Sequence, residues 1–193
     1  MLIGTGFFGS SPADIDKIIK GVKADGNGDA VFQYIRSGKF AAVTGYGTVL
    51  RQLKNPAMVH SVYMTLDQAN KTPTSFLPRM RFEETPPGGG DVDLLIIGTS
   101  GAWALAYQFK GVNGLGNIAG QANSAAAQLA NVPPATKKIV SIEVRAGTYV
   151  DFLASANPVL GQKGYMGGID AFKAANPSVT LKVLFSDSVS KTF

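Results

Sequence analysis

Two short segments of the chain carry side chains that can bind a divalent metal ion. In DVDLLIIG the acidic residues are Asp91 and Asp93, and in AWALAYQFKG the polar residues are Gln108 and Lys110. Alternate side chains of a β-strand lie on one face, so each of these pairs is expected to share a face of its strand. Carboxylate and carbonyl oxygens are the ligands that Mg²⁺ prefers. The sequence therefore predicts one metal-binding cleft, provided that the two segments are neighbouring strands.

The two segments are expected to form one β-hairpin. DVDLLIIG is a β-branched and aliphatic run, the TSG after it is turn-like, and AWALAYQFKG reads as a second strand. Phe109 would then point into the core and offer its backbone carbonyl as a further metal ligand. A bound ion would stabilise negative charge on a substrate, and Lys110 would place a positive charge close to the ion.

Further acidic residues lie just before this hairpin. Of the thirteen acidic residues of the chain, four fall between Glu83 and Asp93. Gln108 is a neutral amide, so it offers an oxygen to a metal ion without adding negative charge, and metal binding should be weaker than with a glutamate. We therefore expect Glu83 or Glu84 to contribute a third acidic group.

The composition of the chain sets wider limits. With 193 residues and 45% hydrophobic content it can bury one substantial core, and the net charge of +5 suits a polyanionic partner. Cysteine is absent, which excludes disulfide frameworks, thiolate metal sites and cysteine nucleophiles. No apolar run is long enough for a membrane-spanning segment.

The hairpin is expected to lie in an α/β core that follows a mainly helical N-terminal part. We place the helical region at residues 1–78 and the core at residues 79–193, and expect both to form one compact unit. The loop TPPGGG, at residues 85–90, is the strongest break in the sequence. Helices are expected at 29–36, 55–70, 117–131, 149–153 and 168–175, and strands at 80–84, 137–144 and, last in the chain, 180–185; residues 43–53 are ambiguous.

The segment from Gly90 to Ile96, GDVDLLI, together with YQFK at 107–110, resembles the two motifs of the PD-(D/E)XK nuclease superfamily. The resemblance covers residues 90–144 and implies a restriction-endonuclease-like mixed sheet flanked by helices. It implies that Asp93 and Gln108, with Asp91 beside them, hold Mg²⁺ or Mn²⁺. It also implies that Lys110 positions or activates the attacking water.

Beyond that span, the chain is similar in general character to small bacterial toxin nucleases, such as those at the ends of contact-dependent growth-inhibition proteins. This likeness implies a phosphodiester substrate in DNA or RNA, tRNA included, and a cognate immunity protein. It also implies a protein that is secreted, or delivered into the cytoplasm of a target bacterium.

Other interpretations of the same region remain open. The hairpin can be an ordinary one with solvated ends, in which case the protein is a non-catalytic module that binds nucleic acid or protein. Glycines before an alanine-rich helix, with Glu143 in the next strand, resemble a dinucleotide-binding unit, although their spacing does not match a strict G-x-G-x-x-G motif. Gln121 and Gln128 lie on one side of that helix and can either reach phosphates or simply face water. The glycines concerned are Gly111, Gly114, Gly116 and Gly120.

Overall fold

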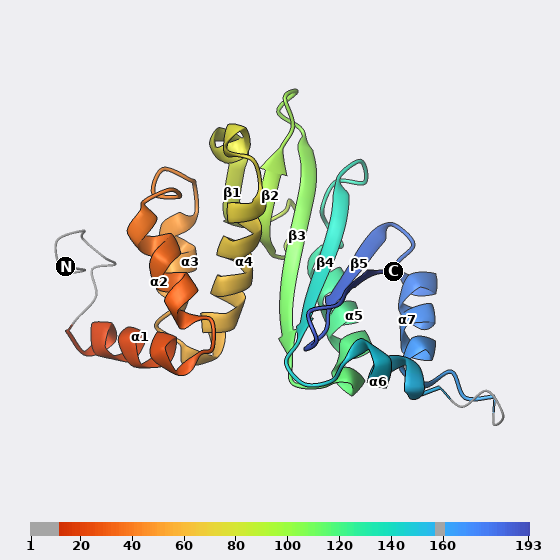
Figure 1. Cartoon of the computed structure of the whole chain (residues 1–193). Coiled ribbons are helices and arrows are strands. Elements are labelled where there is room, and N and C mark those ends of the chain that lie inside the picture. The colour runs from red at the N-terminus through yellow and green to blue at the C-terminus, as the bar shows by residue number, and fades with distance from the viewer. Residues whose placement is uncertain (1–11, 157–160) are drawn as a thin grey trace. The chain divides into compact units, whose positions relative to one another are not determined.

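The computed structural model describes residues 12–156 and 161–193. It is a mixed α/β protein with six strands and several helices in this part of the chain (Figure 1), which confirms the predicted class. The chain divides into two compact units, Met1–Glu84 and Thr85–Phe193. The boundary predicted from the sequence lies after residue 78, in a chain expected to form one compact unit.

The first unit is mainly helical. Its core consists of aliphatic and aromatic side chains, with Val22, Val31 and Val62 fully buried. The helix expected at residues 55–70 forms a 3-10 turn followed by a longer helix. The elements are α1 (Pro12–Ala24), α2 (Gly28–Ser37), α3 (Tyr46–Gln52), η3 (Pro56–Met58), α4 (Val59–Lys71), η4 (Thr74–Arg79) and β1 (Met80–Glu84).

Strand β1 belongs to the helical unit because its side chains pack there. Phe82 is buried, and its ring lies 6.0 Å from Phe40 and 6.2 Å from Tyr46, between centroids. Its backbone N–H donates to the carbonyl of Thr44. Gly45 has a φ of +84° and a Cβ there would lie 1.9 Å from the Phe82 carbonyl oxygen, so only glycine fits this contact.

The second unit is built on a mixed sheet whose strands follow the order β2-β3-β4-β5-β6. The β2–β3 and β5–β6 pairs are antiparallel, and β3, β4 and β5 run parallel. The predicted hairpin is thus present, and a helical crossover leads from it to the next strand. The strands are β2 (Val92–Ile97), β3 (Trp103–Val112), β4 (Lys137–Val144), β5 (Val179–Leu184) and β6 (Ser190–Thr192).

The second unit also contains the helices α5 (Ile118–Gln128), α6 (Tyr149–Ala154) and α7 (Gly164–Ala175). A short 3-10 turn, η5 (Leu115–Asn117), precedes α5. Figure 1 shows α5 behind β3 and β4. The alanines of α5 pack closely against the strands. Ala122 and Ala125 share one buried cluster with Leu95 and Ala106. The face of the sheet that carries Leu95 and Ala106 is therefore the one that the helix covers.

The expected elements differ from the structure at two places. Residues 180–185 are not the last strand, because β6 follows and pairs with β5. Its sequence, Ser-Lys-Thr, has no apolar alternation that would predict a strand. Helix α7 begins at Gly164, four residues before the expected start, and the ambiguous segment 43–53 contains α3.

In the described ranges 12–156 and 161–193, no helix combines the length and the apolar character that a lipid bilayer requires.

Candidate metal centre

The hairpin brings Asp93 and Gln108 into direct contact. Gln108 Nε2 donates to Asp93 Oδ1 at 3.1 Å. Asp93 lies two residues before Leu95 and Gln108 two residues after Ala106, and Leu95 pairs with Ala106 in the ladder. Both side chains therefore lie on the helix-covered face, and both are buried, with exposed fractions of 5% and 2%.

The regular pairing of the two strands stops at the site. The ladder runs from Ile97 to Leu94, which faces Tyr107. At the next position the Phe109 N–H donates to the Asp93 carboxylate, Oδ2, at 2.6 Å instead of continuing the backbone ladder. The Phe109 ring is buried and stacks on Tyr107, on the other face of the sheet from Gln108. Asp93 is thus held by one donor on each carboxylate oxygen.

Asp91 stands beside Asp93, just before β2. The two carboxyl groups each offer an oxygen within 4.8 Å of the other. The backbone N–H of Asp91 donates to the carbonyl of Gln128, at the end of α5, at 3.2 Å. Gly90 makes this contact possible, because its φ is +111° and a Cβ would lie 2.3 Å from that same carbonyl oxygen. The TPPGGG loop therefore sets the position of Asp91.

Lys110 lies on the same face of the sheet as Asp93 and Gln108. It pairs with Ile142 of β4, which lies in the helix-side core. Its side chain is half-buried. Within residues 12–156 and 161–193 it makes no ion pair shorter than 4.0 Å, although its charge acts on both aspartates. Its ammonium group can therefore contact a substrate.

Burial dominates the electrostatics of the two aspartates. Desolvation raises the pKa of Asp93 to about 7, against the lowering effects of the Phe109 N–H, Lys110 and Gln108, while the neighbouring Asp91 raises it further. Desolvation also raises the pKa of Asp91, and Lys110 and the Val92 N–H oppose that shift. A divalent cation at this position would favour the ionised form of both groups.

The raised pKa predicts how the metal-free protein responds to pH. Between about pH 4 and 7 the folded state retains the Asp93 proton that the unfolded state has lost. The free energy of unfolding should therefore fall as the pH rises through this window, by up to about 1.4 kcal/mol per pH unit, and show no further Asp93 effect above it. Denaturant unfolding in chelator from pH 4 to 8 measures this slope.

Asp93→Asn supplies the control for the pH experiment, because it keeps the shape of the side chain and removes the titration. Between pH 4 and 7 the free energy of unfolding should fall more steeply with rising pH in the parent than in the variant. Metal affinity should change in the opposite sense, and weaken as the pH falls below about 7, because the ion competes with the proton. Equal slopes for parent and variant would contradict the burial of an ionisable Asp93.

One buried atom indicates that these residues suit a metal ion. Gln108 Oε1 is buried and has no hydrogen-bond partner within the described part of the chain. A buried amide oxygen without a partner costs about 1–3 kcal/mol, and such atoms commonly receive a water or an ion. Two carboxylates and a neutral oxygen form an all-oxygen donor set of the kind that Mg²⁺ and Mn²⁺ accept. The donors present therefore fit the predicted ion.

The third acidic group expected from the sequence, Glu83 or Glu84, lies outside the hairpin. Glu83 and Glu84 are the last residues of β1, in the first unit. Gln52 Nε2 donates to Glu83 Oε2 at 2.6 Å, and Glu83 has a φ of +51°, which non-glycine residues rarely adopt. The role of Glu83 or Glu84 in metal binding stays a prediction.

The glycines that imitated a dinucleotide-binding loop have ordinary backbone angles. A parallel strand-helix-strand unit does connect β3, α5 and β4. Gly111, however, lies inside β3, and Gly116 lies inside η5. Gly111, Gly114, Gly116 and Gly120 are absent from the positive-φ positions of the described chain. The structure gives this alternative no support beyond the strand order.

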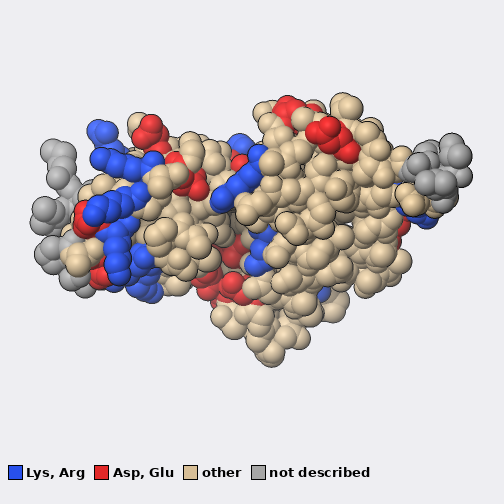
Figure 2. All heavy atoms as spheres, turned by 90° about the horizontal axis from the view of Figure 1, so that it is seen from below, with Lys and Arg blue, Asp and Glu red and all other residues tan. Residues whose placement is uncertain are grey.

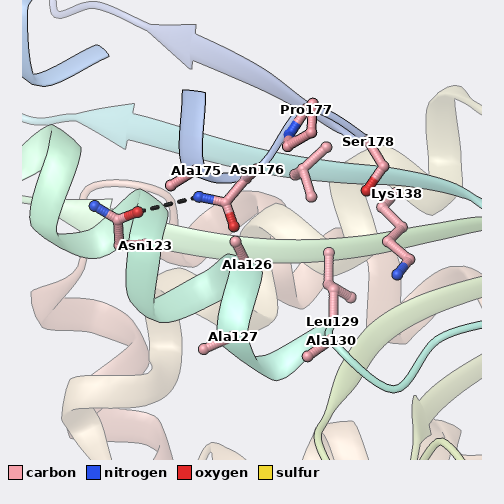
Figure 3. Close-up of a pocket in the computed structure, with 11 residues that line it drawn as sticks. Asn123, Ala126, Ala127, Leu129, Ala130, Lys138, Ala175, Asn176, Pro177 and Ser178 are labelled. Carbon is pink, nitrogen blue, oxygen red and sulfur yellow. Dashed lines mark hydrogen bonds between the residues drawn. The ribbon is translucent and has the colours of Figure 1, made fainter. Parts of the chain in front are cut away.

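A separate pocket of about 290 Å³ lies on the other side of α5. Figure 3 shows it between α5 and the segment after α7, where Asn176 Nδ2 donates to Asn123 Oδ1 at 3.2 Å. Lys138, exposed by only 8%, lines it together with residues at the C-terminal ends of both helices. Helix C-termini favour a nearby cation, so a lysine suits this place.

The described residues define a mixed α/β protein with acidic, amide and lysine side chains clustered on one face of its sheet. Comparisons with protein-family models, with curated proteins and with solved structures find no match to the chain.

Proposed function

We propose that the protein is a metal-dependent nuclease that hydrolyses phosphodiester bonds of DNA or RNA. The observation that carries this proposal is the Asp93 carboxylate, which is 5% exposed, has no ion pair within 4.0 Å in the described chain and lies next to a second carboxylate. A charge in such surroundings is costly unless a cation neutralises it.

The strand arrangement supports a restriction-endonuclease-like core. The acidic strand β2 pairs antiparallel with β3, which carries Gln108 and Lys110, and α5 then leads to the parallel strand β4. This order agrees with the resemblance of residues 90–144 to the PD-(D/E)XK superfamily.

Each residue of the site has a defined part in the proposed reaction. Asp91, Asp93 and Gln108 would hold the ion, and a further acidic ligand from Glu83 or Glu84 stays a prediction of the sequence. When bound, the ion stabilises charge on the phosphate and lowers the pKa of water. The Phe109 N–H fixes one oxygen of Asp93, at 2.6 Å, and so orients the carboxylate. Lys110 directs its positive charge at the attacking water or the phosphate.

The charge of the protein agrees with a polyanionic substrate. On the face that Figure 2 shows, Lys and Arg side chains gather on the helices of the first unit. Exposed basic residues of α1 and α2 include Lys17, Lys23 and Arg36. We further propose that the nuclease acts as a bacterial toxin domain, for which a cognate immunity protein would be the partner.

Incubation with plasmid DNA and with total tRNA tests the proposed activity. With Mg²⁺ or Mn²⁺ the purified protein should cleave at least one of the two substrates, and excess chelator should stop cleavage because the carboxylates then lack their ion. Restored cleavage on adding Mg²⁺ back is the control for irreversible damage. Binding of nucleic acid with no cleavage in any divalent ion would favour the non-catalytic binding module instead.

A further inference from the structure

A second glutamine of the second unit has the same unusual feature as Gln108. In the described part of this unit, the buried side-chain oxygens without a hydrogen-bond partner are Gln108 Oε1 and Gln128 Oε1. Both residues also hold one of the two aspartates. Gln108 donates to the Asp93 carboxylate, and the Gln128 backbone carbonyl accepts the Asp91 N–H.

The position of Gln128 on α5 directs it toward the hairpin. Ala122 and Ala125 face the sheet, and Gln128 follows Ala125 by three residues, so it lies beside that buried stripe. The opposite flank of the helix carries Asn123 and Ala127, which line the separate pocket in Figure 3. Gln128 therefore lies on the flank toward Asp91, and its backbone contact with that residue agrees.

The chemistry of an amide oxygen suits this place. Mg²⁺ and Mn²⁺ bind oxygen ligands and retain several waters, which need acceptors for their hydrogens. Asp91 and Asp93 already bring two carboxyl groups within 4.8 Å, so another acidic group would add repulsion in the absence of the ion. A neutral oxygen adds an acceptor without adding charge.

We propose that Gln128 is a binding residue of the metal centre and supplies a second neutral oxygen, beside that of Gln108, to the hydrated divalent ion. The proposal rests on the metal centre of the proposed function and names a residue outside its two strand motifs. Gln128 joins α5 to the site in two ways. Its backbone carbonyl fixes Asp91, and its side chain faces the ion.

Binding of Mn²⁺ to the full chain, measured by calorimetric titration without nucleic acid, tests this role. Gln128→Leu removes the oxygen but keeps the backbone carbonyl that holds Asp91. Its Mn²⁺ affinity should fall by about tenfold or more, the scale of losing a supporting group at a metal site. Gln121→Leu is the matched control, because Gln121 lies two turns earlier on the same helix and is exposed, and its affinity should equal that of the parent.

Denaturant unfolding in chelator separates binding from folding. Gln128→Leu should unfold at the same or a higher denaturant concentration than the parent, because it removes a buried oxygen without a partner. If that variant does not fold, Gln128→Glu replaces it. This variant keeps an oxygen, adds charge and should bind Mn²⁺ more tightly, so an unchanged affinity would count against the proposal.

The outcomes distinguish this inference from the proposed function. If the parent binds Mn²⁺, and both Asp93→Asn and Gln128→Leu weaken binding, the role of Gln128 is supported. If Asp93→Asn weakens binding and Gln128→Leu does not, the Gln128 inference is overturned and the metal centre stands. If the parent does not bind Mn²⁺, the metal centre itself is wrong, and the role of Gln128 is overturned with it.

Discussion

Cleavage by the Asp93→Asn variant is expected to fall by on the order of a thousandfold or more, and its affinity for Mg²⁺ or Mn²⁺ by more than about a hundredfold. The substitution keeps the shape of the side chain and an oxygen that can accept the Phe109 N–H, which now bonds at 2.6 Å. It removes the negative charge that holds the ion. Cleavage rate against metal concentration, at pH 8, measures both effects.

The stability of Asp93→Asn should change in the opposite direction from its activity. Asp93 is 5% exposed, and burial raises its pKa to about 7, so its ionised form is unfavourable in the metal-free protein at pH 8. Replacing it with a neutral amide should therefore leave the free energy of unfolding unchanged or raise it. An inactive variant that is more stable than the parent is the mark of a residue kept for function. A variant that cleaves at the parent rate while folded would contradict the site.

Gln108→Glu is the comparison that shows which side chains face the ion. It retains an oxygen and adds a charge next to Asp93, so metal affinity should be preserved or tightened in the presence of the ion. In chelator the same variant should lose stability, because a second buried carboxylate would stand 3.1 Å or so from the first, the distance that now separates Gln108 Nε2 and Asp93 Oδ1. The metal affinities of Gln108→Glu and Asp93→Asn should therefore diverge.

Lys110→Ala is expected to slow cleavage by on the order of a hundredfold while the metal remains bound. Lys110 is half-buried, lies on the face of Gln108 and acts by its charge on Asp91 and Asp93. Its loss removes an electrostatic group from the reaction, but removes no ligand of the ion. Single-turnover cleavage at saturating Mg²⁺ separates this effect from metal binding.

The Lys110→Ala variant also has a pH signature. The lysine charge lowers the pKa of both aspartates, so its removal should shift the pH dependence of Mn²⁺ binding upward. Lys173→Ala, on an exposed position of α7, is the control and should cleave at the parent rate. Equal rates for Lys110→Ala and the parent would show that the lysine has no part in the chemical step.

The sequence by itself determined the elements with strong local periodicity. The aliphatic run of β2 predicted one strand, and the alternating residues around Gln108 and Lys110 predicted a second, because side chains two residues apart in a strand lie on the same face. The short turn between them predicted that the two strands form a hairpin. The same reasoning located β4 and the alanine-rich helix α5. The placement of the Asp93 and Gln108 side chains on one face of the sheet needed only the hairpin register, which depends on residues close in the chain.

Only the tertiary structure decided the features that depend on distant residues. Strand β6 is polar and forms because β5 offers it a partner, and β1 joins the first unit because Phe82 packs on Phe40 and Tyr46. The unpartnered oxygen of Gln128 and its backbone contact with Asp91 join residues far apart in sequence. Burial of Asp93, and hence its raised pKa, likewise results from the packed fold, because desolvation is a property of all the atoms around a group and not of its neighbours in the chain.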